Sequence, residues 1–219
     1  MITPNYTSLD GRIRFYNCDC MELMSSGKVW DLAVVDPPYG IGIDGQKLNN
    51  KNKNPKHNRK SHKFKGWDNA IPNKVYFDSL LNISKNQIIW GGNYFTEYLK
   101  PVKAWIFWYK GQNDLTMSDG ELAWTSFDKV TRQIKINRAE LIKQITQHPT
   151  EKPIKLYRWI IQNYAKSGDT ILDTHGGSMS SAIACHMEGF ELDICELDKE
   201  YFDAAVNRFK IYEQQQKLF

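Results

Sequence analysis

The sequence predicts an α/β fold built around a parallel sheet, and three observations carry this prediction. Apolar runs of strand length recur along the 219 residues. One of them, "WDLAVVD" (30–36), is apolar almost throughout, as expected of a strand that is covered on both faces. From residue 153 to the end, helical and strand patterns alternate, which is typical of βαβ units. The length and an apolar content of 41% suit a single domain, residues 1–219, with its own core.

Seven segments have the length and composition of strands. In chain order they are "IRFYNCD" (13–19), "WDLAVVD" (30–36), "NQIIWGG" (86–92), "KAWIFWYK" (103–110), "ELAWTSF" (121–127), "DTILDTH" (169–175) and "FELDICELD" (190–198).

Four segments have helical patterns. They are "DSLLNIS" (78–84), "PIKLYRWIIQNYAKSG" (153–168), "SMSSAIACHMEGF" (178–190) and "DKEYFDAAVNRFKIYEQQQ" (198–216). The second begins with Pro153 and ends with Gly168, which are frequent helix boundaries.

The composition excludes several classes of protein. No apolar run is long enough to span a membrane, and the first residues lack the apolar core of a signal peptide, so we expect a cytoplasmic protein. Four cysteines are too few for a disulfide scaffold in a chain of this length. Cys18 and Cys20 form a C-x-C pair, but no second pair stands at metal-ligand spacing, so we expect no metal site.

The net charge of +4 is unevenly distributed. Between residues 45 and 67 there are eight basic residues and no acidic one, so the rest of the chain is net acidic. The basic residues are Lys47, Lys51, Lys53, Lys56, Arg59, Lys60, Lys63 and Lys65. This insert has no apolar periodicity, so we expect a mobile loop that orders on contact with a polyanion, with a solvated loop as the alternative.

A glycine loop near the C-terminus predicts a nucleoside-containing cofactor. A strand ends at Asp173, the loop carries Gly176 and Gly177 before a helix starts at Ser178, and Glu196 follows at the end of the next strand. Dinucleotide sites place an acid about 20 residues after such a loop, where it binds ribose hydroxyls. Asp173 would repel a pyrophosphate but could hold a cationic amine, and S-adenosylmethionine combines an amine, a sulfonium and a ribose. A purely structural glycine turn is the alternative.

The segment "DPPYG" (36–40) follows the buried strand 30–36. Taken alone, it is compatible with an ordinary turn, because Asp and Pro are common turn formers. Together with "LDTHGGSMSSAIA" and "HPTEKP", however, it resembles the circularly permuted, β group of DNA methyltransferases that methylate exocyclic amines. The catalytic motif of that group precedes the cofactor loop, as here, and the resemblance covers roughly residues 13–39 and 86–210.

The resemblance implies roles for individual residues. Asp36, Pro37, Pro38 and Tyr39 match the catalytic motif. The residues that match cofactor-binding positions are Asp19, Asp36, His148, Lys152, Asp173, His175, Gly176, Gly177, Ser178 and Glu196. Thr174, His175 and Met179 depart from the usual proline, phenylalanine and glycine, and we expect Met179 to crowd the cofactor.

The resemblance also implies a doubly wound, mostly parallel seven-stranded sheet, the fold of class I S-adenosylmethionine-dependent methyltransferases. The strand that ends at Asp173 would neighbour the strand that ends at Asp36, and residues 103–127 would form an antiparallel hairpin. The implied reaction transfers a methyl group from S-adenosylmethionine to N6 of an adenine flipped out of double-stranded DNA. Cytosine N4, RNA adenine, and a nucleic-acid-binding protein without activity stay open as alternatives.

Target recognition has little space in this chain. Family members carry a recognition segment where this chain has only residues 128–147, which are short and basic. Either the loop 41–69 shares recognition, or the target is very short, or a partner or second subunit contributes. A homodimer and a partner restriction endonuclease are therefore both left open.

Overall fold

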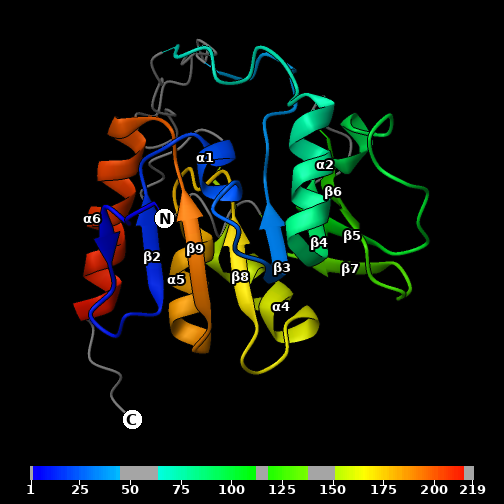
Figure 1. Cartoon of the computed structure of the whole chain (residues 1–219). Coiled ribbons are helices and arrows are strands. Elements are labelled where there is room, and N and C mark those ends of the chain that lie inside the picture. Colours follow the sequence, from blue (N-terminus) through cyan, green and yellow to red (C-terminus); the bar gives the residue numbers. More distant parts are fainter. Residues whose placement is uncertain (1, 45–63, 112–117, 138–150, 215–219) are drawn as a thin grey trace, which may run out of the picture.

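The computed structural model describes residues 2–44, 64–111, 118–137 and 151–214. One sheet of nine strands forms its centre, in the order β1-β2-β9-β8-β3-β4-β6-β5-β7 (Figure 1). The strands are β1 (Tyr6–Thr7), β2 (Ile13–Tyr16), β3 (Trp30–Val35), β4 (Ser84–Trp90), β5 (Trp105–Tyr109), β6 (Gly120–Thr125), β7 (Arg132–Lys135), β8 (Thr170–Asp173) and β9 (Glu191–Cys195).

Helices cover both faces of this sheet. They are α1 (Cys20–Met24), α2 (Lys74–Ile83), α4 (Ile154–Tyr164), α5 (Ser180–Glu188) and α6 (Lys199–Gln214), with a 3₁₀ turn, η2 (Gly92–Tyr94). In the view of Figure 1, α1 and α2 lie in front of the sheet, and α4 and α5 lie behind it.

The alternation of side chains along β3 explains why this strand is apolar throughout. Leu32 and Val34 join the core that α4, α5 and α6 cover, whereas Ala33 and Val35 join the core under α1 and α2. Because helices cover both faces of the sheet at this strand, polar residues cannot alternate with apolar ones along it. The α/β prediction is therefore confirmed for the physical reason that suggested it.

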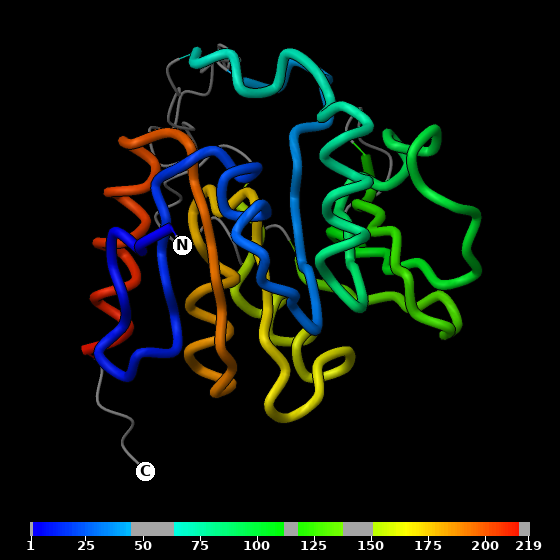
Figure 2. The backbone as a smooth tube through the Cα atoms, viewed as in Figure 1, coloured from blue at the N-terminus to red at the C-terminus, as the bar shows by residue number. Residues whose placement is uncertain are grey.

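The strand order is that of a doubly wound sheet. β2, β9, β8, β3 and β4 pair in parallel. β6 lies antiparallel between β4 and β5, which confirms the predicted hairpin. Figure 2 shows blue β3 beside yellow β8, two segments far apart in the sequence. Their pairing, with Leu32 opposite Ile171, confirms the predicted neighbourhood.

The structure adds elements that the sequence patterns did not predict. Seven predicted strands became nine, because β1 has two residues and β7 four, too few for a clear period. Four residues of the predicted recognition segment 128–147, Arg132–Lys135, form β7 and pair with β5 at the sheet edge. The strand predicted at 13–19 ends at Tyr16, because the side chain of Asp19 caps α1.

Candidate functional site

The carboxyl ends of β3 and β8 meet at one edge of the sheet. β3 is followed directly by Asp36, and β8 ends at Asp173. Since the two strands are paired in parallel, both acidic residues reach the same edge. From here the chain continues to opposite sides of the sheet, towards β4 and towards β9. Doubly wound proteins bind ligands at this switch point.

A cavity of about 740 Å³ opens at this edge, a volume typical of small-molecule sites. Most of the residues that the sequence analysis singled out contribute to its wall. They are Asp19, Asp36, Pro38, Lys152, His175, Gly176, Gly177, Ser178 and Glu196. The fold thus brings the segment after β3, the glycine loop and the end of β9 into one cavity. Pro37, Tyr39 and Asp173 do not line it.

Two donors from separate parts of the chain hold the Asp36 carboxylate. Tyr39 donates its hydroxyl hydrogen to Oδ1 at 2.7 Å. The ammonium of Lys152, which stands just before α4, forms an ion pair with Oδ2. The fold therefore joins the residue predicted as catalytic to a lysine predicted to contact the cofactor.

A second carboxylate, Glu121 on β6, completes this arrangement and was not predicted. Its Oε2 lies 3.1 Å from Nζ of Lys152, and its Oε1 lies 2.6 Å from Nζ of Lys110. Asp36, Glu121, Lys110 and Lys152 form what we call the charge cluster. It contains two negative and two positive charges, and the side chain of Lys152 is only 3% exposed.

Burial and opposite charge compete within the charge cluster. Burial raises the pKa of Asp36, and the pKa stays raised although Lys152 favours the ionised form. Burial would also raise the pKa of Glu121, but Lys152 and Lys110 outweigh it and lower this pKa to about 2. Burial would lower the pKa of Lys152, yet the two carboxylates raise it. Asp36 is therefore the carboxylate of the cluster that protonates more readily.

The ring of Tyr39 packs on the turn that follows β4. It stacks on Tyr94, with centroids 5.1 Å apart and planes inclined by 16°. Gly91 starts this turn with a φ of 69°, and a Cβ there would lie 2.2 Å from Cε1 of Tyr39. The turn therefore needs glycine both for its backbone conformation and for the space that Tyr39 fills.

Glu196 holds the glycine loop in place. Its Oε2 accepts a hydrogen bond from the Gly177 N–H at 2.8 Å, and its Oε1 accepts one from the Asp198 N–H at 2.9 Å. The N–H of Gly176 donates to the Cys195 carbonyl at 2.8 Å. A Cβ at Gly176 would lie 3.0 Å from the Ile194 side chain, so the loop rests closely on β9.

Asp173, for which the sequence predicts a contact with the amine of a cofactor, is buried beneath the loop. Its side chain accepts hydrogen bonds from the Ser181 hydroxyl at 2.6 Å and from the His175 N–H at 3.1 Å. Burial raises its pKa to about 7, although both hydrogen bonds act to lower it. Asp173 therefore shapes the loop from the protein side.

Met179 also points away from the cavity, so the expectation that it crowds a cofactor is wrong. Its side chain is fully buried in the core behind the sheet. The reason for the family's usual glycine is nevertheless visible, because Met179 has a φ of 56°. Residues other than glycine adopt this left-handed conformation only at an energetic cost.

His175 is held by a short chain of hydroxyl groups. The Tyr76 hydroxyl lies 2.7 Å from Oγ1 of Thr174, which lies 2.9 Å from Nδ1 of His175. Burial lowers the pKa of His175 to about 4, so the imidazole is neutral near pH 7. His175 thus faces the cavity as an uncharged ring.

Lys65 is the member of the predicted DNA-binding set that falls within the described residues, and acidic side chains surround its ammonium. Its ammonium lies 2.7 Å from both Asp198 and Glu200, and it stands over the ring of Tyr201. It lines the cavity with its charge neutralised. The other members of the set lie outside the described residues; they are Lys47, Lys51, Lys53, Lys56, Arg59, Lys60 and Lys63. His148, predicted to contact the cofactor, also lies outside them.

Two aspartates close the base of the basic insert. Asp44 accepts a hydrogen bond from the Lys65 N–H at 2.8 Å. Asp68 accepts two, from the N–H groups of Gly40 and Ile43, both at 2.8 Å. The chain before the insert is thus bonded to the chain after it, next to the charge cluster.

A further unpredicted contact supports the glycine loop from α6. Arg208 donates to the Ser178 carbonyl at 2.8 Å and to the Ser180 hydroxyl at 3.1 Å. It also pairs with Glu151 at 2.7 Å, whose side chain is 3% exposed. Arg208 therefore connects α6, the loop and the segment before α4.

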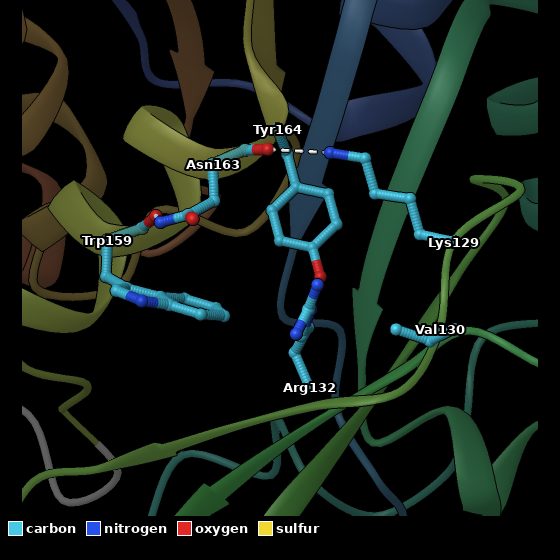
Figure 3. Close-up of a pocket in the computed structure, with 6 residues that line it drawn as sticks. All are labelled: Lys129, Val130, Arg132, Trp159, Asn163 and Tyr164. Atoms are coloured by element: carbon cyan, nitrogen blue, oxygen red, sulfur yellow. Dashed lines mark hydrogen bonds between the residues drawn. The ribbon is translucent and has the colours of Figure 1, made fainter.

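A second cavity, of about 370 Å³, lies at the opposite end of α4 (Figure 3). Lys129 donates to the Asn163 carbonyl at 2.7 Å across its wall, beside Arg132 and Trp159. None of the predicted site residues lines it.

Metal-binding clusters and membrane spans are both absent from the described residues. These residues contain no group of three or more His, Cys, Asp or Glu side chains arranged to bind a metal ion. None of their helices combines the length and the apolar character that crossing a membrane requires.

A known protein family matches a large part of this chain. The family model for N6- and N4-methylating enzymes, described as DNA methylase, matches residues 69–207, more than half of the chain. The match begins after the Asp36–Tyr39 segment. The search of curated proteins found no match.

Solved structures share the fold at low sequence identity. A complex of M1.HpyAVI with SAM has a TM-score of 0.59 and 20% identity, over 90% of this chain and 99% of that one. The cytosine-N4-specific PvuII DNA methyltransferase has a TM-score of 0.63 and 15% identity, over 99% of this chain and 90% of that one. TTHA0409, a putative DNA modification methylase from Thermus thermophilus, has a TM-score of 0.56 and 15% identity, over 91% of this chain and 94% of that one.

Proposed function

The chain belongs to the DNA methylase family of N6- and N4-methylating enzymes, and on that premise we propose that it methylates N6 of adenine in DNA. One observation carries the proposal. Asp36 shares the wall of a single cavity with the glycine loop and with Glu196. A group that acts on an amine thus stands beside the elements that would hold the methyl donor.

The cofactor is S-adenosylmethionine, which supplies an electrophilic methyl group when bound. The residues of the cavity fit it. A carboxylate offers about four acceptor positions, so Glu196 retains capacity for ribose hydroxyls after accepting its two backbone N–H groups. The close packing of Gly176 on β9 keeps the loop low enough for a ligand to approach its backbone. Asp19 lines the same cavity and offers a further acceptor.

Asp36 would act on the target amine. The lone pair of an exocyclic amine is delocalised into its ring, so the amine is a weak nucleophile. Acceptors facing its N–H bonds favour a tetrahedral nitrogen with a localised lone pair. Asp36 would provide one acceptor and the Pro37 carbonyl a second, held by the fixed φ of two consecutive prolines. Correct positioning of the amine then supplies much of the rate.

Tyr39 would stack on the flipped base, a contact worth roughly 1–3 kcal/mol. Tyr94 already stacks on Tyr39, so this part of the site is suited to flat rings. The preference for adenine rests on the aspartate that starts the motif, which in this family accompanies adenine more often than cytosine.

DNA contacts would come from the basic insert. Seven of its eight basic residues precede Lys65, whose charge is neutralised by acidic neighbours. Such contacts fix position and affinity and leave sequence discrimination to other segments. With β7 in the sheet, the candidate recognition segment shrinks to residues after 135. We therefore propose a short target or a contribution from a second subunit or partner.

The test is a methylation assay with labelled S-adenosylmethionine on defined DNA and RNA, followed by hydrolysis to nucleosides. We expect N6-methyladenine from DNA. N4-methylcytosine, or product from RNA alone, would contradict the proposal. Asp36→Ala should lose at least about 100-fold in kcat, since it removes the group that positions the amine. A wild-type rate in this variant would show that Asp36 is not involved.

A further inference from the structure

Both oxygens of Asp36 are already engaged. Tyr39 donates to Oδ1 and Lys152 contacts Oδ2. A target amine carries N–H donors and needs an acceptor with a free lone pair that faces it. Each oxygen keeps a second lone pair, but the neighbouring ammonium weakens the carboxylate as an acceptor, so Asp36 binds the amine most strongly after Lys152 has moved away.

Glu121 stands within reach of both donors. Its Oε2 lies 3.1 Å from Nζ of Lys152 and 3.5 Å from the hydroxyl oxygen of Tyr39. Lys110 holds the other oxygen of Glu121 at 2.6 Å. One oxygen of Glu121 is thus anchored, while the other faces the two groups that occupy Asp36.

We propose that Glu121 is a positioning residue: it takes over Lys152 and Tyr39 when the target amine displaces them from Asp36. This inference rests on the proposed function, because it concerns the entry of the target base. Glu121 contacts neither the base nor the methyl donor and acts through Lys152 and Tyr39.

The cost of an unpaired buried charge favours this transfer over a simple departure of Lys152 from Asp36. Leaving a buried carboxylate or ammonium unpaired is strongly unfavourable. If Lys152 moves from Asp36 to Glu121, the ammonium stays paired throughout. Asp36 exchanges a cation for the N–H groups of the amine, and Lys110 keeps Glu121 in place.

The experiment is a double-mutant cycle in the full-length protein. Glu121→Gln keeps the shape and removes the charge. We expect kcat to fall roughly 10- to 100-fold with an unchanged KM for S-adenosylmethionine, because Lys152 then stays on Asp36. Lys152→Met removes the group to be transferred, so adding Glu121→Gln to it should lower kcat by less than a factor of about two. Glu191→Gln is the control for the loss of one carboxylate, because Glu191 begins β9 and lies away from the charge cluster. This variant should have a normal kcat.

Each result of this experiment either supports or contradicts the role of Glu121. A wild-type kcat for Glu121→Gln, or an equal loss in both backgrounds, would overturn the proposal. If Glu121→Gln unfolds, Glu121→Asp carries the test: it keeps the charge and should retain most of kcat, and a folded but inactive Glu121→Asp would contradict the proposal. Failure of the proposed function would differ, since the wild-type protein would then give no methyladenine.

Discussion

Gly91 and Tyr39 occupy adjoining space: a Cβ on Gly91 would lie 2.2 Å from Cε1 of the tyrosine ring. The two residues are far apart in the sequence and meet because β3 and β4 are parallel neighbours. The position of the ring beside Asp36 therefore depends on the absence of one side chain in the next strand's turn.

Gly91→Ala should displace Tyr39 and impair methylation. The variant combines a steric clash with a φ of 69°, which alanine adopts only at a cost of about 1 kcal/mol. We expect lower stability and a kcat reduced by at least about 10-fold, because the clash displaces the ring on which the flipped base would stack. Urea unfolding and steady-state kinetics measure the two effects.

Gly27→Ala is the matched control for that variant. Gly27 has a φ of 80°, and a Cβ there would have no neighbour within 4 Å. It should therefore show the backbone cost alone and a normal kcat. Equal kcat values for the two variants would mean that the clash with Tyr39 has no functional effect.

Asp173 should make stability fall as the pH rises from about 4 to about 7. Its pKa is raised from 3.8 to about 7 by burial, so in this window the folded protein holds a proton that the unfolded chain has lost. The stability that it contributes is complete below pH 3.8 and is lost as the pH rises towards 7. Its full size is at most on the order of 4 kcal/mol.

Asp173→Asn should remove this slope. The amide oxygen can still accept from the Ser181 hydroxyl or the His175 N–H, so the loop keeps a partner. Urea unfolding of both proteins between pH 4 and 8 provides the comparison. An unchanged pH dependence would show that Asp173 is ionised in the folded protein at pH 5.

His175 should produce a slope of the opposite sign. Its pKa is lowered by burial from 6.5 to about 4, so between these values the unfolded chain takes up a proton that the folded protein does not. The stability present above pH 6.5 is therefore lost as the pH falls towards 4. His175→Phe should flatten the unfolding free energy over this range. A slope unchanged by the substitution would mean that the imidazole is protonated in the folded state.

Arg208→Met should destabilise the protein by up to about 3–5 kcal/mol, because it breaks the ion pair with Glu151, whose side chain is only 3% exposed. The glycine loop also loses the donor to the Ser178 carbonyl, so we expect weaker binding of S-adenosylmethionine. Calorimetric titration and chemical unfolding measure both effects. In the double variant Arg208→Met/Glu151→Met, stability should return towards wild type while cofactor affinity stays low. Normal affinity in the folded double variant would assign Arg208 a purely structural role.

The sequence predicted the fold more fully than the site. Apolar segments covered on both faces, such as 30–36, are distinctive because burial leaves no room for polar residues. The neighbourhood of Asp36 and the glycine loop followed from the resemblance to a family. Short edge strands such as β7 were not predicted, because four mostly exposed residues show no alternation of apolar and polar side chains.

The partners of Asp36 could be predicted only in part. Tyr39 and Lys152 belong to motifs, but Glu121 is a single acid in an otherwise ordinary strand. Its position depends on the register of β6 against β4, which places Ala123 opposite Trp90. The direction of Met179 was missed for a similar reason, since a left-handed backbone turns its side chain into the core.

The bonds of Asp44 and Asp68 at the base of the basic insert make it an exchangeable cassette. These hydrogen bonds hold the described residues at the two ends of the insert in place. Loop-closure entropy grows only slowly with length, about 0.6 kcal/mol per doubling. Related chains can therefore lengthen, shorten or replace this segment without refolding the catalytic domain. The DNA affinity that we propose for the insert can then change in evolution, or by redesign, while the chemistry stays constant.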